Sequence, residues 1–475
     1  MGVGLNIDYV LVCPRCKLEY REEPNIYRCS RCGVQLEYRY SLENIDFYSV
    51  LDNIESIWRY RRLLPKINNI VSLGEGFTPT YPIRRLKNSL RIKIREVYVK
   101  DDSRNPTGSF RDRAASIVSS RAVDWNYEAV VCASNGNMGA SLAAYVAKAG
   151  LTCYIYAPMY VDIGKLAQII MYGGIIEQVG ETLDEAILRA IKAERNNWYQ
   201  GTPELNPLSI EAQKTIAYEL IEQIGVPNWI ICPTGSGSII YSIWKGFNEA
   251  YDMGLIKRKP RLIAVQADGC SPIVTAFLKS SEIVKIRKPQ TIASGICVAN
   301  PLYGVKALEA LKDSRGIAVS VSDEDILRSQ KNLSKLEGLF VEPAAASTIA
   351  ALEKLSSQEV FEKDETVLCF ISGSGLKTID LIGAYEKGWG KFNIYASTKV
   401  KILNVLKIRG MHGYEIWKSI GKIMKIQAVY QHLNELEKLG LIKSQIVGRR
   451  RIYSLTGKGE SLLKAVEEIK TLLTT

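Results

Sequence analysis

Histidine is nearly absent from this chain, and long apolar runs are missing. Only His412 and His432 are present among 475 residues, both within the last eighty positions, so histidine-based catalysis is excluded from the large central part. No run of about 18 apolar residues could cross a bilayer. The N-terminus lacks the basic stretch and apolar core of a secretory signal. We therefore expect a cytoplasmic protein that does not use a membrane as a partner.

The composition is that of a folded chain of two or three units, with 47% hydrophobic and 24% charged residues. In a reducing compartment the ten cysteines would be metal ligands or buried thiols. Positive charge is concentrated between Lys399 and Thr475, where 15 Lys and Arg face 6 Asp and Glu, about three quarters of the net charge of +12. Such a block is typical of a protein that binds a phosphate backbone, although a solvated basic face would give the same count.

Two Cys-x-x-Cys pairs lie near the N-terminus. Cys13 and Cys16 form the first pair, Cys29 and Cys32 form the second, and twelve residues separate them. This spacing can place four thiolates around one zinc ion, and four protein ligands leave no open position for a substrate. The pattern predicts a structural zinc ribbon over residues 1–45. A redox pair is the alternative, but two spaced pairs without a neighbouring βαβ pattern argue against it.

Short apolar runs alternate with amphipathic segments between residues 46 and 395. The runs at 128–133, 151–157, 229–232, 262–265 and 367–371 predict buried strands, and the segment 140–149 predicts a helix. This alternation indicates an α/β domain over 46–395 with parallel sheets. In open α/β sheets, the turns that follow the strands line the ligand crevice.

Three Gly/Ser/Asn-rich turns follow such strands. The turn Gly235-Ser236-Gly237-Ser238 precedes a helix, so its backbone could approach a phosphate closely and offer N–H groups to it. The turns Ser134-Asn135-Gly136-Asn137 and Ser372-Gly373-Ser374-Gly375 follow two other strands. One such turn alone could be a tight connection, but three at one sheet edge predict a binding site.

The last segment predicts a winged helix-turn-helix domain over residues 396–475. Helical periodicity covers 399–409, 414–420 and 425–439, two strands at 441–447 and 451–455 form a hairpin, and a final helix follows Thr456. Lys425, Gln427, Ala428 and Gln431 would face the major groove, and Arg449, Arg450 and Arg451 would reach phosphates or the minor groove. The segment 411–416 with its basic wing resembles PadR-like regulators, which implies DNA as a partner. Some winged helices bind only proteins.

Several motifs of the central part resemble those of threonine synthases. They are VSLGEGFTP at 71–79, KD at 100–101, NPTGSF at 105–110, EAQKT at 211–215, IWKGF at 243–247, QADGCSP at 266–272, VEPA at 341–344 and GLK at 375–377. The resemblance covers about residues 10–390. It implies the fold type II architecture of pyridoxal-phosphate enzymes, with two α/β subdomains, the cofactor between them, and a homodimer.

The resemblance also implies roles for single residues. Asn137 would bind the pyridine hydroxyl of pyridoxal phosphate, Ser372 would meet the ring nitrogen, and Gly235, Ser236, Gly237 and Ser238 would hold the phosphate. Ser109, Arg111, Ser134 and Asn135 would contact a substrate or effector. Two departures indicate a changed site, because Met138 lacks a hydroxyl that the family uses and Ser238-Ile239 replaces a Gly-Asn pair.

Arg111 is the decisive departure. In the family, the residue after the Ser-Phe pair is the lysine that forms a Schiff base with pyridoxal phosphate, but here the segment reads Ser109-Phe110-Arg111. A Schiff base needs a neutral primary amine, whereas arginine keeps its proton and is a poor nucleophile. We therefore expect little or no turnover of O-phosphohomoserine, unless Lys100, Lys245 or Lys377 reaches the aldehyde.

These features together predict a DNA-binding transcription regulator whose former enzyme module senses a metabolite. Pyridoxal phosphate, its amino-acid adducts, threonine and O-phosphohomoserine are the candidate effectors. An effector changes DNA affinity only if it binds two states of the protein differently. The alternatives are an active threonine synthase with an autoregulatory DNA-binding domain, an inert scaffold, and a different lyase.

Overall fold

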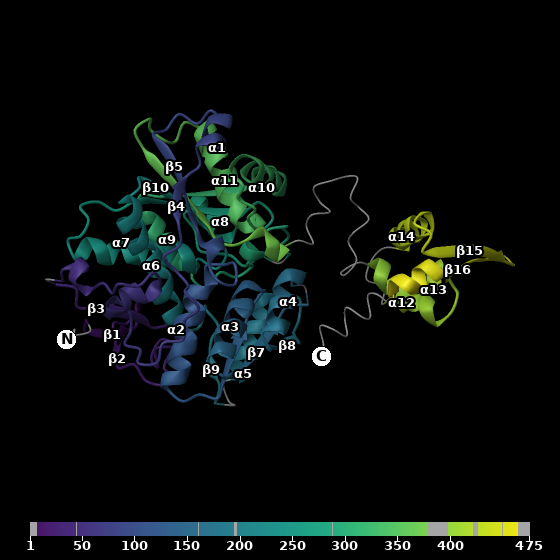
Figure 1. The fold of residues 1–475 in the computed structure, drawn as a ribbon, viewed down its shortest axis with the longest axis horizontal. Helices are drawn as coiled ribbons and strands as arrows, with labels where there is room; N and C mark the ends of the chain where they lie inside the picture. Colours follow the sequence, from purple (N-terminus) through teal and green to yellow (C-terminus); the bar gives the residue numbers. More distant parts are fainter. Residues whose placement is uncertain are drawn as a thin grey trace. The chain divides into compact units, whose positions relative to one another are not determined.

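The computed structural model of the chain describes residues 7–43, 45–159, 161–193, 197–286, 288–378, 398–420, 426–448 and 450–463. It divides into two compact units, Met1–Ile379 and Asp380–Thr475 (Figure 1). None of the helices within these ranges is long and apolar enough to cross a membrane.

A small antiparallel sheet opens the first unit. Its strands are β1 (Tyr9–Val12), β2 (Glu19–Tyr20) and β3 (Glu37–Tyr40), in the order β2-β1-β3. The 3-10 helices η1 (Phe47–Val50) and η2 (Ile57–Leu63) follow. The sheet is tied to the rest of the unit, because the hydroxyl of Tyr40 donates to Glu211 at 2.8 Å.

A six-stranded sheet forms one half of the remaining unit, in the order β12-β11-β10-β13-β5-β4. Its strands are β4 (Thr80–Pro82), β5 (Glu96–Asp101), β10 (Trp229–Pro233), β11 (Arg261–Ala267), β12 (Ile317–Val321) and β13 (Thr366–Ile371). Neighbouring strands are parallel except for the edge strand β4, which is antiparallel to β5. Pro82 is tolerated there because an edge strand leaves one side without ladder hydrogen bonds.

Both faces of this sheet are covered by helices, which explains why its strands are continuous apolar runs. Along β10, Trp229 and Ile231 pack with residues of α1, α10 and α11, whereas Ile230 and Cys232 pack with residues of α6, α7, α8 and α9. The helices are α1 (Arg84–Ser89), α6 (Leu208–Ile224), α7 (Ser238–Asp252), α8 (Pro272–Lys279), α9 (Gly304–Asp313), α10 (Asp323–Glu337) and α11 (Pro343–Ser357). The 3-10 helices η3 (Asp102–Arg104) and η5 (Ser294–Ile296) lie in connections.

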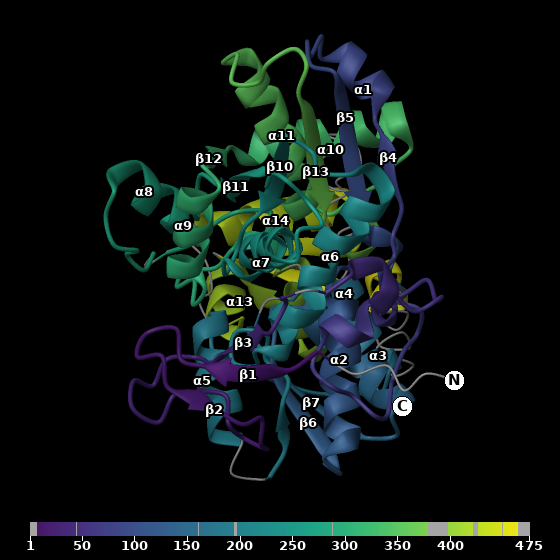
Figure 2. The same ribbon diagram turned by 90° about the vertical axis from the view of Figure 1, so that its left-hand side faces the viewer.

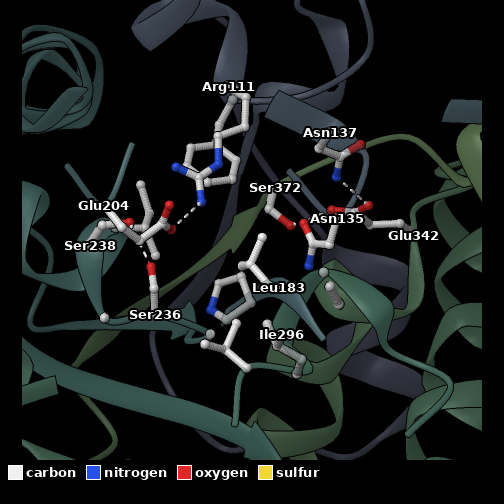
Figure 3. Close-up of a pocket in the computed structure, with 18 residues that line it drawn as sticks. Arg111, Asn135, Asn137, Leu183, Glu204, Ser236, Ser238, Ile296, Glu342 and Ser372 are labelled. Atoms are coloured by element: carbon white, nitrogen blue, oxygen red, sulfur yellow. Dashed lines mark hydrogen bonds and ion pairs between the residues drawn. The ribbon is translucent and has the colours of Figure 1, made fainter. Parts of the chain in front are cut away.

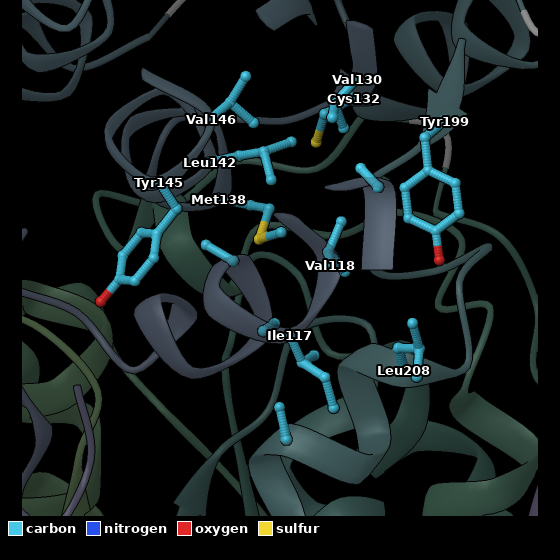
Figure 4. Close-up of a cluster of buried hydrophobic side chains, with 14 of the residues drawn as sticks. Ile117, Val118, Val130, Cys132, Met138, Leu142, Tyr145, Val146, Tyr199 and Leu208 are labelled. Carbon is cyan, nitrogen blue, oxygen red and sulfur yellow. The ribbon is translucent and has the colours of Figure 1, made fainter. Parts of the chain in front are cut away.

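A four-stranded parallel sheet forms the other half, in the order β8-β7-β6-β9. Its elements are β6 (Ala129–Ala133), β7 (Thr152–Ala157), β8 (Ile175–Gln178) and β9 (Tyr199–Gln200), with α2 (Arg111–Asp124), α3 (Asn137–Lys148), α4 (Ile163–Met171) and α5 (Leu183–Ala193). Figure 4 shows the core, where Val118 of α2 and Leu142 of α3 meet Val130 of β6. The two sheets occupy different halves of the unit in both views (Figure 2). The predicted two-subdomain α/β architecture with parallel sheets is confirmed.

The second unit is a small helical domain with a three-stranded antiparallel sheet. Its elements are α12 (Thr398–Ile408), β14 (Met411–His412), α13 (Gly413–Ser419), α14 (Ile426–Lys438), β15 (Ile442–Val447) and β16 (Arg450–Leu455), and a further helix starts at residue 457. The three helices predicted at 399–409, 414–420 and 425–439 and the strands predicted at 441–447 and 451–455 lie within two residues of the bounds of α12, α13, α14, β15 and β16. The short strand β14, which pairs with β16, has no sequence signal of its own.

Candidate ligand-binding site

The four cysteines of the N-terminal pairs converge on one point. The sulfurs of Cys13, Cys16, Cys29 and Cys32 all lie within 4.8 Å of one another. Tetrahedral coordination with Zn–S bonds of about 2.3 Å places sulfurs about 3.8 Å apart, so this cluster fits one zinc ion. The Tyr20 hydroxyl donates to the Cys29 sulfur at 3.2 Å and lowers the pKa of Cys29 to about 6, which favours the thiolate that a metal requires.

Removing one of these ligands tests the metal site. We expect the native chain to bind one zinc ion. We expect the Cys29→Ser variant to lack that ion and to unfold at a temperature several degrees lower, because the small sheet has little core of its own. Elemental analysis and thermal unfolding measure both effects. Cys153→Ser, at a buried thiol outside the cluster, is the control, and native protein purified without zinc would contradict the expectation.

The three Gly/Ser/Asn-rich turns meet around one cavity (Figure 3). Of the residues predicted to form the site, those that line the cavity are Arg111, Asn135, Asn137, Gly235, Ser236, Gly237, Ser238 and Ser372. Phe110, Leu183, Glu204, Ile296 and Glu342 line it as well. The turns converge because parallel strands of both sheets present their carboxyl ends to the same crevice.

The turn before α7 has the geometry of an anion-binding loop. Gly237 has φ +93°, and a Cβ there would lie 2.6 Å from the carbonyl oxygen of Tyr303. A Cβ on Gly235 would lie 3.1 Å from the carbonyl oxygen of Gly295, so both glycines permit close packing of backbone. Helix α7 starts at Ser238, and the first N–H groups of a helix lack intrahelical partners and attract anions.

Arg111 lies at the first position of α2 and projects into the cavity (Figure 3). Its guanidinium lies over the ring of Phe110, 4.7 Å from the centroid, and one nitrogen is 3.9 Å from a carboxylate oxygen of Glu204. Its Nη1 atom is buried and has no hydrogen-bond partner. Burial lowers the pKa of Arg111, and Glu204 opposes that shift, but a guanidinium stays protonated at neutral pH. The cavity thus holds a cation with unused hydrogen-bonding capacity.

Glu342 joins the two groups expected to contact a pyridine ring. Ser372 Oγ donates to Glu342 Oε1 at 2.9 Å, and Asn137 Nδ2 donates to Glu342 Oε2 at 2.9 Å. Asn137 Oδ1 is buried without a partner. Glu342 belongs to a quoted sequence motif, but its position between two distant turns could not be read from the sequence.

Two of the predicted site residues, Ser134 and Ser109, lie close to the cavity but do not line it. Ser134 Oγ accepts hydrogen bonds from the amides of Gly136 and Gly139 at 3.0 and 2.8 Å, so it fixes the start of α3. Ser109 is fully buried and lies 3.4 Å from the hydroxyl of Ser141. Both are held by backbone and side chains of the scaffold.

Lys165 is a buried amine close to the site that sequence reasoning missed. It is almost fully buried, and its amine lies 2.5 Å from Asp162, 3.1 Å from Ser294 Oγ and 3.9 Å from Glu342. A Cβ on Gly136 would come within 2.4 Å of the Lys165 side chain. The amine therefore lies behind the turn that carries Asn135 and Asn137.

The three lysines considered as substitutes for the missing amine point elsewhere. Lys100 bonds the carbonyl of Thr78 and Glu219, each at 2.6 Å, and Lys245 bonds the carbonyl of Tyr38 at 2.6 Å and also Glu211. Lys377 donates to the carbonyl of Thr107 at 2.7 Å and to Gln168 at 2.5 Å, and burial lowers its pKa to about 8. None of the three lines the cavity.

The residues fit the phosphate and the ring substituents of pyridoxal phosphate but not covalent attachment of its aldehyde. Ser372, the orphaned amide oxygen of Asn137 and the glycine turn before α7 supply the polar contacts. The cavity volume is about 40 Å³, room for a few water molecules, so a cofactor-sized ligand requires its side chains to move. No primary amine faces the cavity from the described residues.

In the second unit, the residues predicted to contact DNA lie on two exposed elements. Gln427 and Gln431 are exposed one turn apart on α14, Ala428 is half-buried, and Arg450 and Arg451 are exposed on β16. Lys425 and Arg449 lie outside the described residues. Arg451 donates hydrogen bonds to Ser444 at 2.8 Å and to Glu437 at 2.7 Å. Arg450 Nη1 lies 3.4 Å from Nε2 of His412. His412 itself accepts from the amide of Glu415 and caps α13.

Comparison with known families agrees with both parts of the chain. The family model for pyridoxal-phosphate dependent enzymes matches residues 71–373, and the model for the PadR-like family of transcriptional regulators matches residues 402–465. The first match spans more than half of the chain and contains every residue that lines the cavity.

Curated relatives and solved structures extend this result. The chain is 40% identical over 378 residues to the threonine synthase of Methanocaldococcus jannaschii, covering 78% of this chain and 93% of that protein. It is 38% identical to the threonine synthase of Methanosarcina acetivorans, covering 78% and 92%. A fungal L-serine ammonia-lyase from Rhizomucor miehei shares the fold with a TM-score of 0.58 at 21% identity, covering 66% of this chain and 98% of that one. The chain therefore belongs to the family of pyridoxal-phosphate dependent enzymes, as a threonine synthase homologue with an N-terminal four-cysteine cluster and a C-terminal PadR-like domain.

Proposed function

We propose that this protein is a metabolite-sensing transcription regulator whose synthase-like module binds a phosphate-bearing ligand without making threonine. The observation that carries the proposal is the guanidinium of Arg111 inside the cavity, at the position where the family has its lysine. The domains at 1–45, 46–395 and 396–475 would serve as zinc ribbon, sensor and DNA-binding domain.

The chemistry of Arg111 explains the loss of turnover. When bound in enzymes of this kind, pyridoxal phosphate acts as an electron sink for carbanions, and a lysine amine both holds it and moves protons. A guanidinium does neither, because it keeps its proton at neutral pH. It is well suited to bind a phosphate or carboxylate through two parallel hydrogen bonds. Arg111 therefore favours retention of an anionic ligand over its conversion.

The positions of the polar groups support a small anionic ligand as effector. Arg111 lies in the same cavity as the turn before α7, so one ligand can meet the cation and the N–H groups of the helix start. Pyridoxal phosphate or an analogue, bound non-covalently, and O-phosphohomoserine have the required phosphate. Threonine and an amino-acid adduct of the cofactor would use the carboxylate instead.

The second unit would bind DNA through α14 and the β15–β16 hairpin. Gln427 and Gln431 share the solvent face of α14, whose opposite face, with Val429, Leu433 and Leu436, is buried in the core of this unit. Glutamine can pair with two atoms of an adenine edge in the major groove, and arginines of a wing reach the backbone. A homodimer would place two such units on the half-sites of one operator.

Substituting Gly237 tests the anion-binding turn. We expect Gly237→Ala to weaken binding of pyridoxal phosphate at least tenfold, because the new Cβ would lie 2.6 Å from the Tyr303 carbonyl and would displace the start of α7. Gly254→Ala is the matched control, since Gly254 also has a positive φ (+71°) but open space around it. Titration of cofactor absorbance measures the affinity. Equal affinities of the two variants would contradict the assignment of the phosphate to this turn.

The whole proposal is tested with the purified full-length chain. We expect pyridoxal phosphate to bind, and to be removable by dialysis even after borohydride treatment. We expect no phosphate release from O-phosphohomoserine. We expect the chain to shift the upstream region of its own gene in a gel, with an affinity that falls steeply as salt rises. Phosphate release with threonine formation would instead establish the alternative, an active synthase with an autoregulatory domain. A chain that binds neither the cofactor nor DNA would be an inert scaffold and would refute the proposal.

A further inference from the structure

Glu204 is a buried carboxylate in the wall of the ligand cavity, and it belongs to none of the sequence motifs. It lies between β9 and α6, and its side chain is only 6% exposed. Its carboxylate lies 3.9 Å from the guanidinium of Arg111, which is too long for a hydrogen bond. Within the part of the chain that the structure describes, no hydrogen bond holds this carboxylate and no other cation pairs with it. The pair is therefore loose, and Nη1 of Arg111 stays without a partner.

The pair lies on the side of the cavity where the phosphate is expected. In Figure 3 the Glu204 side chain points toward Arg111. Ser236 and Ser238 of the turn before α7 lie on the same side of this view, whereas Glu342 lies on the other side. The guanidinium and the N–H groups at the start of a helix both bind anions. A carboxylate of the chain itself thus competes with any anionic ligand for Arg111.

Glu204 also lines a second cavity, so its side chain has space to move into. This cavity has a volume of about 290 Å³, and Gln35 of the N-terminal part lines it together with Tyr303 and Lys306 at the start of α9. The side-chain nitrogen Nε2 of Gln35 is buried without a hydrogen-bond partner. The second cavity therefore offers a carboxylate displaced from Arg111 both space and a hydrogen-bond donor.

A tethered carboxylate excludes ligands that offer Arg111 no more than it does. A free carboxylate brings the same charge but loses translational and rotational freedom on binding, a cost that the tethered group does not have. The ammonium group of an amino acid such as threonine would also come close to the guanidinium, because it lies one carbon from the carboxylate. A phosphate brings up to about two charges and three free oxygens. It can bond Arg111 through two parallel hydrogen bonds and also meet the start of α7.

We propose that Glu204 is a specificity-determining residue, which competes for Arg111 so that the cavity accepts a phosphate-bearing ligand and rejects one whose only anionic group is a carboxylate. Binding of the phosphate moves the Glu204 side chain from Arg111 toward the second cavity. The inference rests on the proposed function and narrows its candidate effectors to those with a phosphate, which excludes threonine.

Neutralising Glu204 tests the inference on the full-length chain. The affinities for inorganic phosphate, acetate and threonine are obtained from how each displaces pyridoxal phosphate, followed by absorbance. We expect only phosphate to displace it from the native chain. Glu204→Gln should bind phosphate about tenfold more tightly, because two like charges no longer meet, and should bind acetate as well. Glu181→Gln is the matched control, since Glu181 is exposed in the wall of another cavity and its loss removes the same charge away from Arg111.

A second variant covers the case in which Glu204→Gln does not fold. Glu204→Asp keeps the charge but shortens the side chain by one carbon, so it should give a smaller gain in phosphate affinity. An unchanged or weaker phosphate affinity of the folded variants overturns the inference and leaves the proposed function standing. Binding of acetate or threonine to the native chain as tightly as phosphate overturns it too. If neither the native chain nor the variants bind pyridoxal phosphate, the proposed function is contradicted and the inference falls with it.

Discussion

Replacing Arg111 by lysine is expected to give the chain a covalently attached pyridoxal phosphate. The lysine amine would start from the first turn of α2 and point into the cavity. Burial lowers the pKa of the group at this position, and the same desolvation would favour the neutral amine that the aldehyde needs. Glu204, whose carboxylate lies 3.9 Å from the guanidinium of Arg111, would partly oppose that effect. Borohydride reduction followed by mass spectrometry should then find the cofactor fixed to residue 111.

The same variant should gain threonine synthase activity if the rest of the site is intact. A positioned general base contributes about 10²–10⁴ in rate, so phosphate release from O-phosphohomoserine should rise by about 10²-fold or more over the native chain. Arg111→Gln is the matched control, because it removes the guanidinium without supplying an amine. Phosphate release by the native chain at the rate of the lysine variant would contradict the idea that Arg111 abolishes turnover.

The pattern of apolar residues is enough to predict the α/β fold class and the strands β6, β7, β10, β11 and β13. Buried parallel strands such as β6, β10 and β13 are continuous apolar runs because helices cover both faces of their sheets. The amphipathic period of α14 follows from its single buried face. Elements without such a pattern were not predicted: β4 is three residues long and contains a proline, and β14 has two residues and exists only because β16 pairs with it.

Some residues of the site could be predicted from the sequence, whereas those that depend on contacts between distant segments could not. The glycine turn before α7 could be placed in advance because it follows a predicted strand, and Arg111 could be placed because its segment resembles the family's lysine segment. The roles of Glu204, Glu342 and Lys165 depend on contacts between segments far apart in sequence, such as Asn137 with Glu342. Ser134 shows the reverse case, since its hydroxyl caps the start of α3 and does not line the cavity.

Removing the side chains of Gln427 and Gln431 is expected to abolish sequence-specific DNA binding. Both are exposed on α14, and their position at the start of this helix fits base contacts in the major groove. Each lost base contact costs about 1–3 kcal/mol, so the double alanine variant should lose about 10²-fold or more in affinity for its operator. Affinity for unrelated DNA should hardly change, because contacts to phosphates remain.

Arg450→Ala should give the opposite pattern and thereby separates base contacts from phosphate contacts. Arg450 is exposed on the wing, with no acidic partner among the described residues, whereas Arg451 is held by Glu437 at 2.7 Å and contributes to the packing of β16 on α14. Loss of one phosphate contact should weaken operator and unrelated DNA alike and reduce the slope of log affinity against log salt by about 0.9. Lys438→Ala is the control for a general loss of charge, because Lys438 is the last residue of α14, far from its start.

The double glutamine variant also tests the role of α14 itself. If Gln427→Ala with Gln431→Ala left operator binding unchanged, α14 would not be the recognition helix, and a protein partner would be the better explanation of this winged helix.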